Sequence, residues 1–254
     1  MDCTLMHRDV AVAEFSLDEA SGIIVKLNAV VCPKHLPVGV EFRNGTVDRS
    51  ALNAWWVNRS IPASRSGVQQ ALETLGIEST QALVARSAGL SLSDQYWIRP
   101  RESDLQWSAI NFFDHDFSED IGNLLLGKVL DSKNVSFHSP DLTSDGFLAK
   151  RWKIINGKRC LLKGGSSPFR QQPFNEVIAS RLAERLNIPC VKYTSCGMEI
   201  VRTACAKTSS RRIRSLSVLR PLCKRERGET AYPFTGTIRT AVPLFQTQRG
   251  RSTR

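Results

Sequence analysis

Lys163 and Glu176 are the two residues whose types and spacing best suit chemistry on a phosphate group. Lys163 ends a strand-like run, where a compact ammonium can contact nucleotide phosphates. Glu176 lies in the first turn of the helical pattern that follows, where its carboxylate can hold that lysine in place. Each residue also has an ordinary explanation, because lysines often extend into water from a sheet edge and acidic residues favour helix N-termini.

A predicted β-hairpin positions Lys163. Two strand-like runs within residues 151–163 are joined by Asn156-Gly157. Asn-Gly is the strongest short-range signal for a type I′ hairpin turn. Two glycines follow the lysine and leave the backbone free to turn towards a ligand.

The helix after the hairpin is predicted over residues 175–187, with Glu176 in its first turn. It ends before Pro189, which cannot continue a helix. Ile178, Leu182 and Leu186 recur every four residues and predict a buried stripe.

A small polar loop, Thr143-Ser144-Asp145-Gly146, precedes the hairpin. Because glycine has no Cβ, such a loop can bring backbone N–H groups against phosphate oxygens. The same residue types also form very common turns. The hairpin that follows favours a ligand contact for Gly146, and more weakly for Thr143 and Ser144.

The first 130 residues predict strands followed by short helices. Strands are expected over 10–15 and 23–31, helices over 49–56, 66–75, 81–87 and 121–126, an extended run over 89–98, and a linker over 131–140. Asp48 and Ser79 are the expected N-caps. The helices within 66–87 could form a DNA-binding helix-turn-helix, but the second has few cations, so ordinary packing is favoured. A partner-binding role for residues 1–130 is a weaker alternative.

Composition places the charge of +11 in one part of the chain. Residues 195–254 hold 13 Lys and Arg against three Asp and Glu, whereas residues 1–194 hold 22 against 21. The seven cysteines form no CxxC pair and favour reduced intracellular thiols over a metal site. No apolar run approaches the ~20 residues needed to span a bilayer, and no apolar signal core is present, so a cytoplasmic location is expected.

Four segments resemble one protein family, the HipA-like serine/threonine kinases. They are LSLSDQYWI at residues 90–98, TSDGFLAKRWKI at 143–154, RCLLKGG at 159–165 and FNEVIASRLAERLNIP at 174–189. The resemblance covers about residues 5–193. It implies a kinase plan in which a sheet-based N-lobe precedes a helical C-lobe, with an extension in front of the N-lobe.

The resemblance implies ATP as the ligand and phosphorylation of a hydroxyl on a protein substrate. In such kinases the phosphate loop falls at residues 143–146, followed by a basic position filled here by Lys150 and Arg151. Thr143, Ser144, Gly146, Lys163 and Glu176 are then the implied nucleotide contacts. Some members are toxins neutralised by a small helix-turn-helix antitoxin, which would be a further partner.

The chain departs from this family after about residue 193. Such kinases need a catalytic-loop aspartate and further Asp or Asn side chains to hold Mg²⁺. Residues 194–254 contain no aspartate, so no catalytic or metal-ligating residue is assigned. Their Arg-, Ser- and Thr-rich composition predicts a disordered tail and is typical of out-of-frame translation. A frameshift near residue 194 is a hypothesis that the gene sequence tests.

The sequence thus predicts an α+β fold with three parts: an N-terminal α+β region over 1–135, a partial kinase N-lobe over 136–193, and a basic tail over 194–254. The predicted function is that of an ATP-binding kinase fragment without catalytic apparatus. The alternative is a nucleic-acid-binding protein, because a dense cationic tail binds phosphate backbones without reading sequence.

Overall fold

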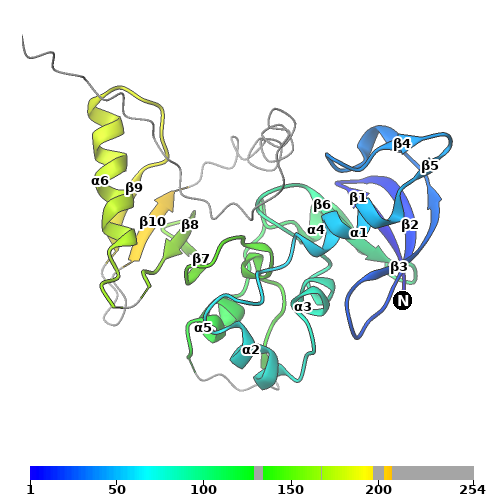
Figure 1. Cartoon of the computed structure of the whole chain (residues 1–254), viewed down its shortest axis with the longest axis horizontal. Helices are drawn as coiled ribbons and strands as arrows, with labels where there is room; N and C mark the ends of the chain where they lie inside the picture. Colours follow the sequence, from blue (N-terminus) through cyan, green and yellow to red (C-terminus); the bar gives the residue numbers. More distant parts are fainter. Residues whose placement is uncertain (129–133, 167, 197–202, 208–254) are drawn as a thin grey trace, which may run out of the picture.

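The computed structural model describes residues 1–128, 134–166, 168–196 and 203–207 (Figure 1). Within these ranges the chain is a mixed α+β structure, with two four-stranded antiparallel sheets, a two-stranded ribbon and several helices. The α+β class expected from the sequence is confirmed. The kinase-like character of the second part stays a prediction.

The first sheet has the strand order β3-β2-β1-β6. Its strands are β1 (Asp2–His7), β2 (Val10–Leu17), β3 (Ile24–Val30) and β6 (Tyr96–Pro100). Alternation along β2 buries Ala13, Phe15 and Leu17 on one side of the strand. The extended run expected over residues 89–98 is wrong before Tyr96, because Asp94 Oδ1 accepts the Tyr96 N–H at 3.0 Å and forms a turn there.

Short helices lie between and after these strands along the chain, and the first of them packs against β3 (Figure 1). They are α1 (Arg49–Val57), α2 (Val68–Leu75), α3 (Thr80–Arg86), α4 (Trp107–Ile110) and α5 (Asp120–Leu125). Both expected N-caps are present: the Asp48 side chain accepts the Ser50 N–H, and the Ser79 hydroxyl accepts the Ala82 N–H. The remaining short elements are η1 (Pro33–His35), β4 (Phe42–Arg43), β5 (Thr46–Val47) and η3 (Pro140–Thr143).

Helices α2 and α3 pack into the core rather than presenting a recognition surface. Leu72 of α2 and Leu83 and Val84 of α3 are buried in the first apolar cluster. Trp56 of α1 is buried in the same cluster, and its indole N–H donates to the Gly22 carbonyl at 2.8 Å. The arrangement agrees with ordinary helical packing over residues 66–87.

The two main apolar clusters cross the boundary expected between residues 135 and 136. Leu142 belongs to the first cluster, and Trp152 belongs to the second with Trp97 and Phe112. The linker expected over 131–140 is packed in its described part, because Phe137 lies against the first cluster and Ser139 is fully buried. Residues 131–133 lie outside the described ranges.

The second sheet has the order β7-β8-β10-β9, and its strands are β7 (Lys150–Ile155), β8 (Lys158–Lys163), β9 (Tyr193–Cys196) and β10 (Thr203–Lys207). Strands β7 and β8 form the expected hairpin. Asn156 and Gly157 both have positive φ, at 51° and 70°, as a type I′ turn requires.

Strands β9 and β10 correct the expectation of a wholly disordered tail after residue 193. Residues 203–207 pair antiparallel with β8 on one side and with β9 on the other. The edge of β8 would otherwise present a row of unpaired backbone groups, which a further strand satisfies whatever its side chains are. The rest of that tail, 197–202 and 208–254, lies outside the described residues.

Helix α6 (Gln172–Arg185) packs against β9 and β10 (Figure 1). The stripe predicted to be buried is exposed: Ile178, Leu182 and Leu186 keep 63%, 55% and 60% of their surface in solvent. The residues buried along α6 are Pro173 and Ser180. The four-residue period correctly placed the three apolar side chains on one face, but a period alone does not say which face is covered.

Candidate phosphate-binding site

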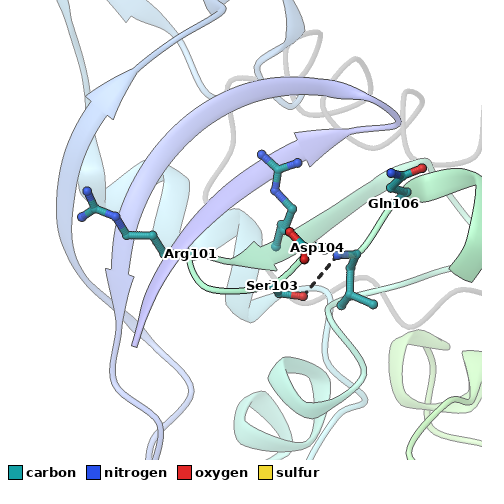
Figure 2. Close-up of a pocket in the computed structure, with 6 residues that line it drawn as sticks. Arg101, Ser103, Asp104 and Gln106 are labelled. Atoms are coloured by element: carbon teal, nitrogen blue, oxygen red, sulfur yellow. Dashed lines mark hydrogen bonds between the residues drawn. The ribbon is translucent and has the colours of Figure 1, made fainter.

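A hollow of about 440 Å³ lies beside the turn after β6 (Figure 2), and none of the residues expected to bind a ligand lines it. It is lined by Arg99, Arg101, Ser103, Asp104, Leu105 and Gln106. The Arg101 side chain is 81% exposed and reaches Asp2 at 3.8 Å. Water competes for such exposed groups, so this hollow offers no enclosed binding site.

Lys163 and Glu176 form the ion pair expected from the sequence. The Lys163 ammonium donates to both carboxylate oxygens of Glu176, at 2.9 Å each, and to the hydroxyl of Tyr193 at 2.8 Å. The side chains of the pair are only 20% and 30% exposed. Although burial of the Lys163 ammonium lowers its pKa, the hydrogen bonds to Tyr193 and Glu176 outweigh this and leave the pKa above its ordinary value.

Three elements place these groups together. Lys163 is the last residue of β8, Glu176 lies near the start of α6, and Tyr193 begins β9. Tyr193 is fixed from its backbone, because its N–H donates to the Ser180 hydroxyl of α6 at 3.1 Å. The contact depends on the packing of α6 against β9, so the sequence around Lys163 gave no signal for it.

Lys150 adds a second ammonium to the site. It is the direct cross-strand partner of Lys163 in the β7–β8 ladder, and its Nζ donates to the Asp145 carbonyl. Burial, together with Arg65 and Lys163, lowers the pKa of Lys150 to about 8, against the opposing effect of Glu176. An anion bound here would relieve that cost.

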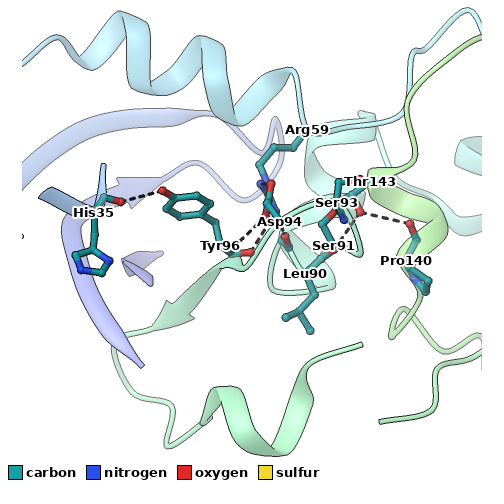
Figure 3. Close-up of polar contacts among 10 residues, drawn as sticks. His35, Arg59, Leu90, Ser91, Ser93, Asp94, Tyr96, Pro140 and Thr143 are labelled. Atoms are coloured by element: carbon teal, nitrogen blue, oxygen red, sulfur yellow. Dashed lines mark hydrogen bonds and ion pairs between the residues drawn. The ribbon is translucent and has the colours of Figure 1, made fainter. Parts of the chain in front are cut away.

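In the loop over residues 143–146, the hydroxyl groups of Thr143 and Ser144 point into the protein. The Thr143 hydroxyl donates to the carbonyls of Leu90 at 3.1 Å and Pro140 at 3.3 Å (Figure 3). The Ser144 hydroxyl donates to the Asp141 carbonyl at 2.9 Å. Both side chains are buried. The hydroxyl groups of both residues hold the loop, and the role of these residues as nucleotide contacts stays a prediction.

Gly146 lies against the Lys150 ammonium. Its φ of 96° is a conformation that only glycine adopts without strain. A Cβ at this position would lie 2.6 Å from the Lys150 Nζ. The glycine therefore permits both the turn and the close approach of the ammonium.

Arg65 hydrogen-bonds the same loop, a contact that the sequence did not indicate. Its Nε donates to the Gly146 carbonyl at 2.8 Å, and its two Nη atoms donate to the Ser144 hydroxyl, at 3.0 Å, and to the Ser144 carbonyl. The guanidinium is 2% exposed, and burial lowers the pKa of Arg65 to about 10, while Asp141 opposes this shift. Arg65 lies between α1 and α2, and no short motif links it to residues so distant along the chain.

Asp141 joins η3 to strand β7 of the hairpin. Its Oδ1 accepts the Trp152 N–H at 2.7 Å, and its Oδ2 accepts the Ser139 hydroxyl at 3.3 Å. Burial raises the pKa of Asp141 to about 7, although these two hydrogen bonds and the guanidiniums of Arg65 and Arg151 oppose the shift.

The site therefore combines the ammoniums of Lys150 and Lys163, a glycine loop, and one carboxylate that pairs with Lys163. Such a set suits a chain of phosphate groups, because compact ammoniums bind phosphate as point charges. Within the described ranges, no group of three or more His, Cys, Asp or Glu side chains lies close enough to hold a metal ion. No helix in those ranges has the length and apolarity needed to cross a membrane.

A scan against models of known protein families gives no match to this chain, and a search of curated proteins gives none either. The likeness of four segments to HipA-like kinases stays a prediction from the sequence. Functional inference therefore depends on the geometry of the site.

Proposed function

We propose that the site around Lys163 binds the phosphate groups of ATP, and that the chain is a HipA-like serine/threonine kinase fragment that binds nucleotide without transferring phosphate. The ion pair between Lys163 and Glu176 is the observation that carries the proposal. In kinases, a glutamate on a helix pairs with a lysine on a strand and so positions the ammonium that contacts the nucleotide.

Lys150 supports an anionic ligand independently of the family likeness. Two ammoniums on directly opposite strands repel each other, and one carboxylate compensates only part of their charge. A phosphate between them would take up hydrogen bonds from both. The lowered pKa of Lys150 reflects burial and the neighbouring cations that such a ligand would neutralise.

Phosphate transfer is not part of the proposal. The catalytic and Mg²⁺-holding aspartates of a kinase lie in a C-lobe, and residues 194–254 contain no aspartate. We expect purified chain to give no phosphotransfer from radiolabelled ATP above background. Robust turnover would refute the claim of inactivity.

Isothermal titration of ATP into the purified chain tests nucleotide binding. We expect Lys163→Met to weaken ATP binding about tenfold or more, as the loss of a charge-assisted hydrogen bond implies. Lys158→Met is the matched control, because Lys158 lies at the exposed start of the same strand. Equal affinity for all three proteins would overturn the proposal.

A double-mutant cycle tests whether the pair acts as a unit. Lys163→Met, Glu176→Gln and the double variant are compared for ATP affinity. If Glu176 acts by holding Lys163, the double variant loses little more than Lys163→Met alone. Additive losses would show that the two side chains contribute separately.

A second candidate function, binding of nucleic acid, is favoured by the 13 Lys and Arg within residues 195–254. Removal of 208–254 tests it while keeping β10, and deletes 11 of those cations. If the tail binds phosphate backbones, retention on nucleic acid falls in the deletion variant, and retention by the full chain falls steeply with salt. Unchanged retention would exclude residues 208–254 as the binding element.

A further inference from the structure

The Lys163 ammonium has no donor left for a ligand in this structure. An ammonium carries three N–H donors, and three acceptors lie within hydrogen-bond distance: two oxygens of Glu176 at 2.9 Å and the Tyr193 hydroxyl at 2.8 Å. All three acceptors belong to the protein. A phosphate oxygen can reach this ammonium with a hydrogen bond only if one of them leaves.

Tyr193 is the acceptor that a phosphate displaces at the lower cost. Glu176 is a carboxylate that contacts Lys163 through both oxygens, whereas the Tyr193 hydroxyl is a neutral group. Both contacts use the charged ammonium as donor, but only the Glu176 contact adds the attraction between opposite charges. Burial raises the pKa of Tyr193, and Glu176 raises it further, against the effect of Lys163, so the phenol stays neutral near pH 7.

The position of the hydroxyl is set by the packing of the second sheet. The Tyr193 N–H donates to Ser180 of α6 at 3.1 Å, and Tyr193 pairs with Ala206 in the β9–β10 ladder. The ring centroid lies 4.9 Å from the Lys163 Nζ, close enough for a cation–π contact. Helix α6 and strand β10 therefore hold the phenol over the ammonium.

We propose that Tyr193 sets the nucleotide affinity of this site by occupying the Lys163 donor that a phosphate oxygen would take. Nucleotide binding then exchanges the Lys163–Tyr193 hydrogen bond for one to phosphate, while the Glu176 contact persists. This inference rests on the proposed function, and it identifies a residue of the site that the sequence did not indicate.

The substitution Tyr193→Phe tests the exchange, because it removes only the hydroxyl and keeps the ring over the ammonium. We expect ATP and inorganic tripolyphosphate to bind about tenfold more tightly, as the hydrogen bond no longer has to be broken. Tyr96→Phe is the matched control. It removes a tyrosine hydroxyl that donates to the His35 carbonyl at 3.0 Å, in the first sheet, and should leave both affinities unchanged.

Equal or weaker binding by Tyr193→Phe overturns the exchange. If Lys163→Met weakens ATP binding while Tyr193→Phe does not strengthen it, the exchange is wrong and the proposed function stands. If neither the wild type nor Tyr193→Phe binds ATP, both are wrong. Acylation of Lys163, followed by mass spectrometry, gives a readout without nucleotide. We expect faster acylation in Tyr193→Phe, and an unchanged rate would contradict the Lys163–Tyr193 contact.

Discussion

Lys150 and Lys163 are direct cross-strand partners in the β7–β8 ladder, yet their ammoniums are held differently. Lys163 is paired with Glu176, whereas the Lys150 ammonium donates to the Asp145 carbonyl. Like charges directly opposite each other destabilise an antiparallel pair. The protein keeps this unfavourable arrangement next to a glycine loop, which is the reason to expect an anion there.

The pKa of Lys150 predicts a particular pH dependence of stability. Burial lowers this pKa to about 8, from 10.5 for an ordinary lysine. The unfolded chain then binds more protons between these values, so stability rises with pH across that window. Urea unfolding measures the free energy of unfolding of the wild type and of Lys150→Met at each pH. Between pH 8 and 10.5, the free energy of unfolding of the wild type should rise by about 2 kcal/mol relative to that of the variant. A constant difference would contradict the lowered pKa.

Asp141 predicts the opposite trend at lower pH. Burial raises its pKa to about 7, from 3.8, so its stabilising contribution is complete below pH 3.8 and is lost as pH rises through 7. In Asp141→Asn this titration is absent. The unfolding free energy of the wild type relative to this variant should fall between pH 4 and 7, as measured by urea titration. A rise over the same range would mean that the nearby guanidiniums dominate.

Gly146→Ala should affect both stability and ligand binding. A positive φ costs alanine about 1 kcal/mol or more, and the new Cβ would lie 2.6 Å from the Lys150 Nζ, which must move. We expect ATP affinity to fall about tenfold, as for one lost charged hydrogen bond. Gly157→Ala carries a similar backbone penalty, with no atom within 4 Å of the new Cβ, and should lose stability but not affinity. Equal affinity in both variants would remove Gly146 from the site.

Arg65→Met should lower stability by about 3 kcal/mol, since it leaves the buried Ser144 acceptors and the half-buried Gly146 carbonyl without their donor. The stability of Arg65→Lys should lie between those of the wild type and Arg65→Met, because an ammonium cannot reproduce the several fixed N–H donors of a guanidinium. Chemical unfolding of each variant measures the cost. Arg101→Met is the control: its side chain is 81% exposed, and its removal should change stability by less than about 0.5 kcal/mol.

Because one face of α6 is exposed, shortening the apolar side chains on that face should cost little stability. Leu182 is 55% exposed, so Leu182→Ala should cost less than about 1 kcal/mol, whereas Leu162→Ala should cost about 2–5 kcal/mol because Leu162 is 2% exposed. Denaturant unfolding of both variants gives the comparison. Similar losses would mean that the Leu182 side chain is covered in solution.

Local signals in the sequence determined the β7–β8 hairpin and two helix caps. Asn156-Gly157 specifies a type I′ turn because both residues tolerate positive φ. Asp48 and Ser79 cap helices because their side chains reach an N–H two or three residues away. Lys163 and Glu176 could also be paired from the sequence, since a strand end and the next helix start are close along the chain.

The sequence by itself therefore determined the hairpin turn, the helix caps and the Lys163–Glu176 ion pair, whereas the tertiary structure decided what surrounds that pair. Arg65 reaches the loop from far upstream, and Tyr193 reaches Lys163 only because α6 packs on β9 and β10. The same packing leaves Ile178, Leu182 and Leu186 of α6 exposed to solvent, and it places residues 203–207 beside β8 in the sheet. Turns and caps act over a few residues, but these contacts depend on which faces meet across the whole molecule, and no local pattern encodes that choice.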